Sequence, residues 1–197
     1  MERFPDIEKQ LNFIIEIDKL KTITRRSKII HDDRYENDAE HSWHLAMMAL
    51  VLHKQANADI DLFKVVKMLL IHDLVEIYAG DTFAYDAKGR EDQFDRELKA
   101  AEKLFGMLPP ELHDEFMGLW LEFEKKESNE AQFALALDRL QPIMLNHQNR
   151  GYTWKLYNVT KEQVLNRNRE IEKGSESLWK YARHIVEKSA EQGFLSE

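Results

Sequence analysis

Apolar residues recur at helical spacing along almost the whole chain, and few helix-breaking residues interrupt them. The 197 residues include only 7 glycines and 4 prolines, and no stretch shows the alternation of a β-strand. Apolar positions three and four residues apart are typical of helices that bury one face. The sequence therefore predicts an all-α fold, and its length suits a single domain spanning residues 1–197.

Capping residues, glycines and prolines set the limits of the expected helices. Asp61 and Ser128 suit N-caps, Gly80 suits a helix end, and Pro142 is expected to kink its helix. The polar stretch TRRSKIIHDDRYEND is expected to be a loop with at most a short helix. Helices are expected at about residues 6–20, 38–55, 61–79, 93–105, 109–126, 128–148, 160–174 and 175–193.

Two sets of apolar residues are assigned to the core from their helical spacing. One is the broad face of the first helix and the other is the tryptophans. They are Leu11, Ile14, Ile15, Ile17 and Leu20, and Trp43, Trp120, Trp154 and Trp179.

Composition excludes several classes of protein. The net charge is −8 with 28 scattered basic residues, which disfavours a nucleic acid polymer as partner. No apolar run approaches the 18 residues of a membrane span, and the absence of cysteine excludes disulfides and thiolate metal sites. The first residues, MERFPDIEKQ, lack the pattern of a secretory signal, so we expect a cytoplasmic protein. A small anionic substrate remains compatible if a bound cation reverses the local charge.

The segment IHDLVEIYAGD places charged side chains inside an otherwise apolar helix. A buried carboxylate must be paired, hydrogen-bonded or bound to a metal. No lysine or arginine lies within five residues of Asp73 or Glu76, so either an arginine distant in sequence or a metal ion must balance them. On a continuous helix His72, Asp73 and Glu76 share one side, where His72 and Asp73 can hold a cation and Glu76 can reach a water on it. The other His-Asp pairs, at 31–32 and 113–114, lie in polar surroundings and are expected to be solvated.

Two other helices carry polar residues beside apolar runs. The sequence EHSWH precedes LAMMALVL, and Asp138 follows FALAL. Taken alone, each histidine could cap its helix, and Asp138 could pair with Arg139 or with another helix. Together, two imidazoles and two carboxylates suit a divalent transition metal, Mn, Co, Fe, Ni or Zn, with positions left for water and substrate. The possible extra ligands are His44, His113 and His147.

The ordered set EHSW, HDLVEIYAGD and ALDRLQP resembles the HD-domain phosphohydrolase superfamily, most closely its small 5′-deoxynucleotidase-like branch. The resemblance covers roughly residues 20–150 and implies an HD-type helical bundle, onto which helices at about 160–192 would pack. It implies functional acids three and eight residues after Asp73, which are Glu76 and Asp81. The metal ligands that it implies are His41, His72, Asp73 and Asp138.

The resemblance also implies an activity and a mechanism. Such enzymes hydrolyse the 5′-phosphomonoester of a deoxynucleoside monophosphate, commonly as homodimers. The branch places an Arg-Trp pair ahead of its first ligand helix, and here TRRSK offers Arg25 or Arg26 to the phosphate but no tryptophan, which leaves the choice between ribose and deoxyribose open. Glu76 would orient or deprotonate a metal-bound water, and Asp81 would protonate the leaving oxygen or position the water. The loop GDTFAYDAKGRED is expected to close over the substrate.

Two alternatives share parts of this pattern. The same metal site could serve a nucleoside triphosphate, a guanosine tetraphosphate or a cyclic nucleotide, but the scarcity of basic residues near the ligands disfavours the first two. A non-enzymatic helical protein with a structural metal would leave Glu76 and Asp81 without a role.

Overall fold

Helices make up most of the protein, as predicted. The computed structural model describes residues 4–83, 85–86, 89 and 91–196. Its α-helices are α1 (Pro5–Ile17), α2 (Asp38–Leu52), α3 (Leu62–Ile71), α4 (Glu76–Ala79), α5 (Gln93–Phe105), α6 (Pro110–Lys125), α7 (Asn129–Gln148), α8 (Tyr152–Leu156), α9 (Lys161–Asn168), α10 (Ile171–Gly174) and α11 (Glu176–Glu191). Short 3-10 helices, η1 (Asp18–Thr22) and η2 (His53–Gln55), follow α1 and α2.

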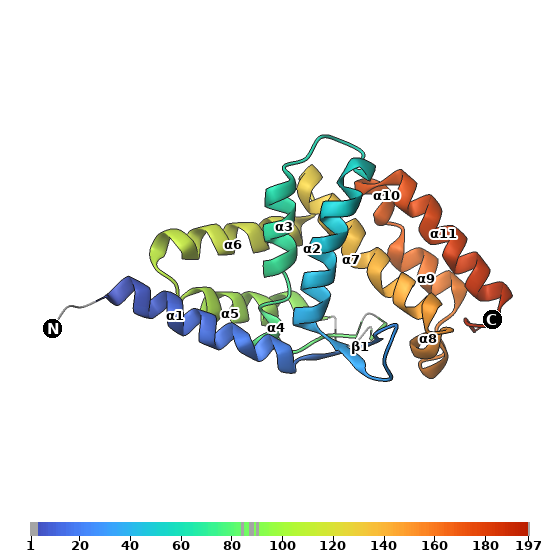
Figure 1. Cartoon of the computed structure of the whole chain (residues 1–197), viewed down its shortest axis with the longest axis horizontal. Helices are drawn as coiled ribbons and strands as arrows, with labels where there is room; N and C mark the ends of the chain where they lie inside the picture. Colours follow the sequence, from blue (N-terminus) through green and yellow to red (C-terminus); the bar gives the residue numbers. More distant parts are fainter. Residues whose placement is uncertain (1–3, 84, 87–88, 90, 197) are drawn as a thin grey trace.

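The long helix α7 is the centre of the bundle. It lies between α2 and α3 on one side and α9 to α11 on the other (Figure 1), and it contacts α2, α3, α6, α10 and α11. Most of its residues from Ala131 to Leu145 are buried, because neighbours cover it on several sides. The predicted cap is confirmed, since the Ser128 side chain accepts a hydrogen bond from the Ala131 N–H. Pro142 lies within the helix, as expected.

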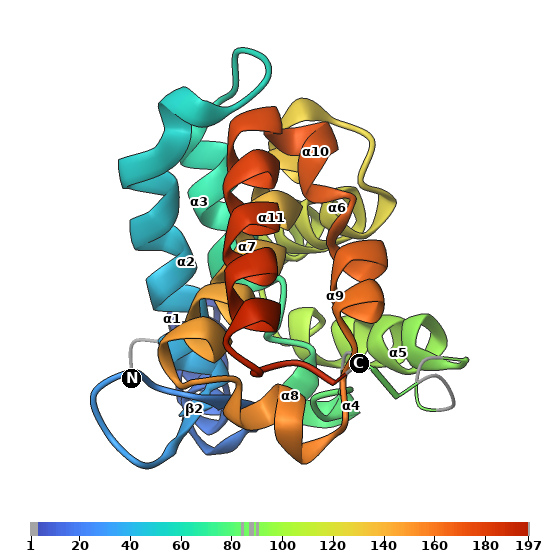
Figure 2. The same cartoon turned by 90° about the vertical axis from the view of Figure 1, so that its right-hand side faces the viewer.

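The last helices pack beside α7, with α11 running along it (Figure 2). The short helix α8 was not expected from the sequence. Among the described residues, no helix combines the length and the hydrophobicity that a membrane span requires. The division into a core and C-terminal packing helices within one domain stays a prediction.

The polar segment before α2 forms a β-hairpin, so the prediction of a loop with at most a short helix was wrong. Strands β1 (Thr24–Lys28) and β2 (Tyr35–Asn37) pair antiparallel, with Thr24 opposite Asn37 and Lys28 opposite Tyr35. The residues that point inward are charged, among them Arg25 and Glu36. The hydrophobic pattern could not indicate these strands, because their buried side chains are not apolar.

The helix expected at 61–79 is interrupted at the His-Asp pair, so its continuity was also predicted wrongly. Helix α3 ends at Ile71 and α4 begins at Glu76. Between them the backbone tightens into turns, with hydrogen bonds from Leu74 N to Ile71 O (3.1 Å) and from Glu76 N to Asp73 O (3.0 Å). The polar side chains therefore sit on a turn and not on a regular helical face.

Two core assignments are also corrected. Trp43 is 63% exposed, whereas Trp120, Trp154 and Trp179 are buried as predicted. On α1 the expected apolar face is largely open, with Leu11 56% and Ile15 70% exposed. A helical apolar pattern shows that a face is to be covered, but it does not say whether the same chain covers it.

Candidate metal centre

The predicted metal ligands come from three places in the bundle. His41 lies in the first turn of α2, His72 and Asp73 lie in the turn after α3, and Asp138 lies in the middle of α7. The start of α2 is fixed by a capping box, in which Glu40 N donates to Asn37 Oδ1 (2.9 Å) and Asn37 N donates to Glu40 Oε2 (3.1 Å). The structure thus brings together residues that are far apart in sequence.

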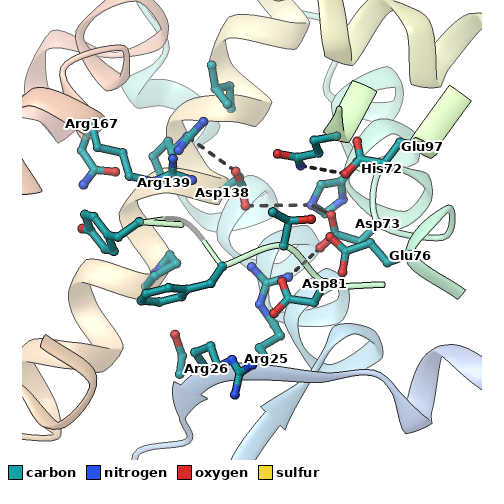
Figure 3. A pocket seen from close by; sticks show the side chains of 18 of the residues that line it. Arg25, Arg26, His72, Asp73, Glu76, Asp81, Glu97, Asp138, Arg139 and Arg167 are labelled. Atoms are coloured by element: carbon teal, nitrogen blue, oxygen red, sulfur yellow. Dashed lines mark hydrogen bonds and ion pairs between the residues drawn. The ribbon is translucent and has the colours of Figure 1, made fainter. Parts of the chain in front are cut away.

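The donor atoms of His41, His72 and Asp73 lie within 4.8 Å of one another and could hold one metal ion, and Asp138 lies beside both histidines. The His41 Nε2 atom lies 3.2 Å from Asp138 Oδ1 and 3.8 Å from Asp73 Oδ2. The His72 Nε2 atom lies 3.1 Å from Asp73 Oδ1 and 3.9 Å from Asp138 Oδ1 (Figure 3). Ligand atoms at ~2.0–2.2 Å from a shared ion lie at most about 4.4 Å from one another. All four measured separations fall within that limit.

The tautomer of His72 also suits a metal ligand. Its Nδ1 atom lies 3.0 Å from the Leu69 carbonyl oxygen, which can only accept, so Nδ1 carries the proton. The Nε2 atom is buried, makes no hydrogen bond within the described residues, and faces Asp73 and Asp138. An imidazole oriented by a backbone carbonyl is typical of histidine ligands.

The buried carboxylate of Glu36 lies on the Nδ1 side of His41, as the Leu69 carbonyl lies on the Nδ1 side of His72. Glu36 Oε2 is 3.7 Å from His41 Nδ1, and Glu36 Oε1 accepts a 2.6 Å hydrogen bond from Gln141. Burial raises the pKa of Glu36 to about 7, against the opposing charge of Arg25. Sequence reasoning missed Glu36, because it lies in a segment that looks hydrophilic throughout.

Arg25 is held by several carboxylates. Its Nη1 atom donates to Asp73 Oδ2 (2.8 Å) and to Asp38 Oδ1 (3.1 Å), and its Nε lies 3.8 Å from Glu36 Oε2. The arginine distant in sequence that could balance Asp73 is therefore present, on strand β1. Asp73 therefore contacts both Arg25 and His72. Sequence reasoning also missed the fully buried Asp38.

The pKa values of the four proposed ligands shift in different directions. Although burial opposes ionisation, the adjacent imidazoles hold the pKa of both Asp73 and Asp138 well below the usual range. Burial alone would lower the pKa of His72, but the charges of Asp73 and Asp138 raise it to about 9. Burial and the charge of Arg25 lower the pKa of His41 to about 4. A cation at this position would compete with the proton on His72.

The two predicted catalytic acids lie next to this cluster. Glu76 is 7% exposed. One carboxylate oxygen from each of Glu76, Asp38 and Asp73 lies within 4.8 Å of the other two. Burial and the charge of Asp73 raise the pKa of Glu76 well above its ordinary value, and burial raises that of Asp81. Asp81 follows Gly80, whose φ of 78° few other residues adopt. Carboxyls with raised pKa values suit proton transfer near neutral pH.

These groups open into a cavity of about 340 Å³. Its walls include Arg25 and the exposed Arg26 on β1, the acids of the cluster, and Arg139 and Arg167 on the far side (Figure 3). The loop expected to close the pocket includes residues 84, 87–88 and 90, which lie outside the described residues. The loop's described part is tied to α5, because Arg96 donates to Ala79 O (2.9 Å), Thr82 Oγ1 (3.2 Å) and Gly89 O (2.9 Å).

The three other candidate histidines have partners elsewhere. His44 Nδ1 lies 3.3 Å from Gln141 Nε2, His113 lies beside Asp114, and His147 Nδ1 lies 2.8 Å from Ser189 Oγ. None of the three belongs to the group of His41, His72 and Asp73, whose donor atoms lie within 4.8 Å of one another. We therefore keep them out of the proposed ligand set.

Comparison with known proteins gives the family. The profile of the HD domain family matches residues 17–179. The chain belongs to the HD domain family. This confirms the resemblance seen in EHSW, HDLVEIYAGD and ALDRLQP, together with the all-α HD-type fold. The ligand set that the resemblance implies stays a proposal.

Named relatives narrow the comparison. The chain is 30% identical over 151 residues to 5′-deoxynucleotidase HDDC2 of Dictyostelium discoideum, covering 74% of this chain and 80% of that one. It is 30% identical over 136 residues to the Homo sapiens protein of the same name, where the match covers 68% of this chain and 65% of the relative. A crystal structure from Magnetospirillum magnetotacticum, titled a predicted metal-dependent phosphohydrolase, is 46% identical over 100% of both chains, with a TM-score of 0.94.

Proposed function

We propose that this protein is a metal-dependent phosphohydrolase that removes the 5′-phosphate from deoxynucleoside monophosphates. The observation that carries the proposal is the convergence of two imidazoles and two carboxylates, of which His72, Asp73 and Asp138 line a cavity of about 340 Å³. The names of the relatives support both the hydrolysis and the class of substrate.

The residues divide the chemistry among them. His41, His72, Asp73 and Asp138 would hold the cation, which supplies an activated water and polarises a phosphoryl oxygen when bound. With the metal bound, Glu76 would take a proton from that water, and Asp81 would give a proton to the leaving 5′ oxygen. Arg26, which is exposed at the mouth of the cavity, carries a charge that attracts the phosphate. Arg25 donates a hydrogen bond to Asp73 that holds it in place, and its positive charge also attracts the phosphate.

The nitrogen and oxygen donor set suits an intermediate divalent metal, and we keep Mn, Co, Fe, Ni and Zn as candidates. The test is release of phosphate from matched 5′-ribo- and 5′-deoxyribonucleoside monophosphates, after chelation and re-addition of each metal. We expect no release before a metal is restored. After a metal is restored, we expect release from the deoxy series and not from the ribo series. Release from both series would make the enzyme a broader nucleotidase, and no release with any metal would contradict the proposal.

We also propose that the protein is a homodimer that pairs through the open apolar side chains of its first three helices. The most exposed of them is Val51 on α2, at 73%, followed by Ile15 on α1 and Phe63 on α3, both at 70%. A large exposed apolar patch marks an interface, and the exposed side chains on these helices are the candidates for one. The cytoplasmic location expected from the sequence stays a prediction.

Light scattering at several concentrations tests this pairing. We expect a dimer mass for the wild type and a monomer mass for Val51→Glu. Leu156→Glu is the matched control, because Leu156 is 53% exposed on α8, outside the first three helices. A monomeric wild type, or a dimeric Val51→Glu, would contradict the proposed interface.

A further inference from the structure

The far side of the cavity carries two arginines that the proposed chemistry does not use. Arg139 follows the proposed ligand Asp138 on α7, and Arg167 lies near the end of α9. Figure 3 places both on the opposite side of Asp138 from His72 and Glu76. We call these two side chains the basic wall of the cavity.

Arg139 has donors that the described protein leaves unused. Its Nε and Nη1 atoms are buried and make no hydrogen bond to any described residue. Among the residues that the structure describes, its ion contact is from Nε to Asp138 Oδ2, at 3.9 Å. A buried donor without an acceptor costs free energy, about 1–3 kcal/mol. A ligand in the cavity that presents acceptors here would remove that cost.

Asn146 offers the complementary group in the same cavity. Its Nδ2 atom donates to Pro142 O (3.0 Å), which fixes the orientation of the amide. Its Oδ1 atom is buried and accepts no hydrogen bond from the described residues. Arg139 and Asn146 are seven residues apart on α7, about 10 Å along the helix axis. A ligand that fits here has hydrogen-bond acceptors for Arg139 and a hydrogen-bond donor for Asn146 Oδ1.

Aromatic side chains complete this part of the cavity. The guanidinium of Arg167 lies 5.9 Å from the centre of the Tyr85 ring, and the buried Trp154 lines the cavity beside them. Flat aromatic walls with a few polar groups suit a planar heterocycle. The metal ligands occupy the other side of the cavity, so a nucleotide with its phosphate at the metal directs its base here.

We propose that the basic wall, Asn146 and Tyr85 bind the nucleobase and prefer bases with a carbonyl oxygen at the purine 6 or the pyrimidine 4 position. This inference rests on the proposed function. Guanidinium groups have donors and no acceptors, so they match the O6 and N7 atoms of guanine or the O4 atom of thymine. Adenine and cytosine present an exocyclic amino donor at the same edge. The ring N–H beside the oxygen in guanine and thymine matches the unused Oδ1 atom of Asn146.

The first test compares four substrates of one metal-loaded preparation. We expect kcat/KM for the guanine and thymine deoxynucleoside 5′-monophosphates to exceed that for the adenine and cytosine ones about tenfold. Equal values for all four would overturn this inference and leave the proposed phosphatase function intact. No hydrolysis of any of them would instead count against the proposed function. A 3′,5′-bisphosphate preferred over every monophosphate would assign the basic wall to a second phosphate and overturn the inference.

Two variants at the end of α9 sharpen the result. Arg167→Gln should raise KM for the guanine substrate several-fold and bring the ratio between the two classes of base toward one. Arg169→Gln is the matched control, because Arg169 is exposed and does not line the cavity as described. An unchanged base ratio in Arg167→Gln would contradict the role of the basic wall.

Calorimetry on the wild type gives a readout that needs no variant and no turnover. Deoxyguanosine and thymidine, which carry no phosphate, should bind the metal-loaded protein more tightly than deoxyadenosine and deoxycytidine. Equal affinities would overturn the inference.

Discussion

Arg25 and Arg139 lie on opposite sides of one cavity, and both are largely buried, with side-chain exposures of 15% and 11%. Arg25 donates to two carboxylates and lies near a third, so its charge is matched. Arg139 has one distant ion contact and unused donors. The difference teaches that a buried arginine surrounded by acids acts mainly on the protein, whereas one with spare donors is available to a ligand.

The largest effects are expected on the acidic side, where two substitutions separate holding the cation from using it. Asp73→Ala should lose metal, because it removes a ligand that lies 3.1 Å from His72 Nε2. Glu76→Ala should keep metal and lose turnover about 10²–10⁴-fold, as expected for a general base. Metal content by elemental analysis, beside phosphate release, separates the two steps. Metal loss in Glu76→Ala would contradict this division of roles.

The comparison of the two arginines predicts unequal losses of stability. Arg25→Leu leaves Asp38 and Asp73 buried without their cation and should lower the free energy of unfolding by about 3–5 kcal/mol. Arg139→Leu should cost clearly less, because its donors are already unpaired, but it should weaken substrate binding. Urea unfolding of both variants measures the difference. Equal losses would remove the distinction between the two arginines.

A third prediction concerns a buried acid whose hydrogen bond comes from a neutral group. Glu97 is 5% exposed and accepts a 2.7 Å hydrogen bond from Gln93, and burial raises its pKa to about 7. A raised folded-state pKa adds stability below the unfolded value, near 4.5, and that stability is lost as pH rises through about 7. Glu97→Gln should therefore match the wild type near pH 4.5 and be more stable above pH 7, by up to about 3 kcal/mol.

Thermal or urea unfolding across pH checks this difference. Glu102→Gln, an exposed position on the same helix, is the control and should leave the pH profile unchanged. A Glu97→Gln variant whose pH profile is parallel to that of the wild type would show that Glu97 ionises normally in the fold.

Sequence patterns indicated three of the four proposed metal ligands because these stand out against apolar neighbours, whereas the resemblance chose His41 over His44. His72, Asp73 and Asp138 interrupt strongly hydrophobic helices, and burial of such groups demands a partner. Glu36 and Asp38 were missed for the opposite reason, since they lie in and directly after the second strand of a hairpin whose sequence is polar. In that hairpin the inward-facing Arg25 and Glu36 are stabilised by their opposite charges and not by apolar packing.

The basic wall and the apolar faces show two further limits. Arg139 was visible only as a possible partner of Asp138, and nothing in the sequence indicated that Arg167, on a helix near the end of the chain, would reach the same cavity. On α1 the periodicity gave a correct helix, but Ile15 is 70% exposed where burial in the core was expected. Periodicity specifies which residues share a face, while the packing partner of that face depends on tertiary and quaternary structure.

We propose that one divalent cation binds between His41, His72, Asp73 and Asp138. Anomalous diffraction from a crystal loaded with manganese or cobalt tests this most directly. We expect one strong peak within bonding distance of the Nε2 atoms of both histidines and of oxygens of both aspartates. A strongest peak among Asp38, Asp73 and Glu76, or a peak away from the cavity, would contradict it.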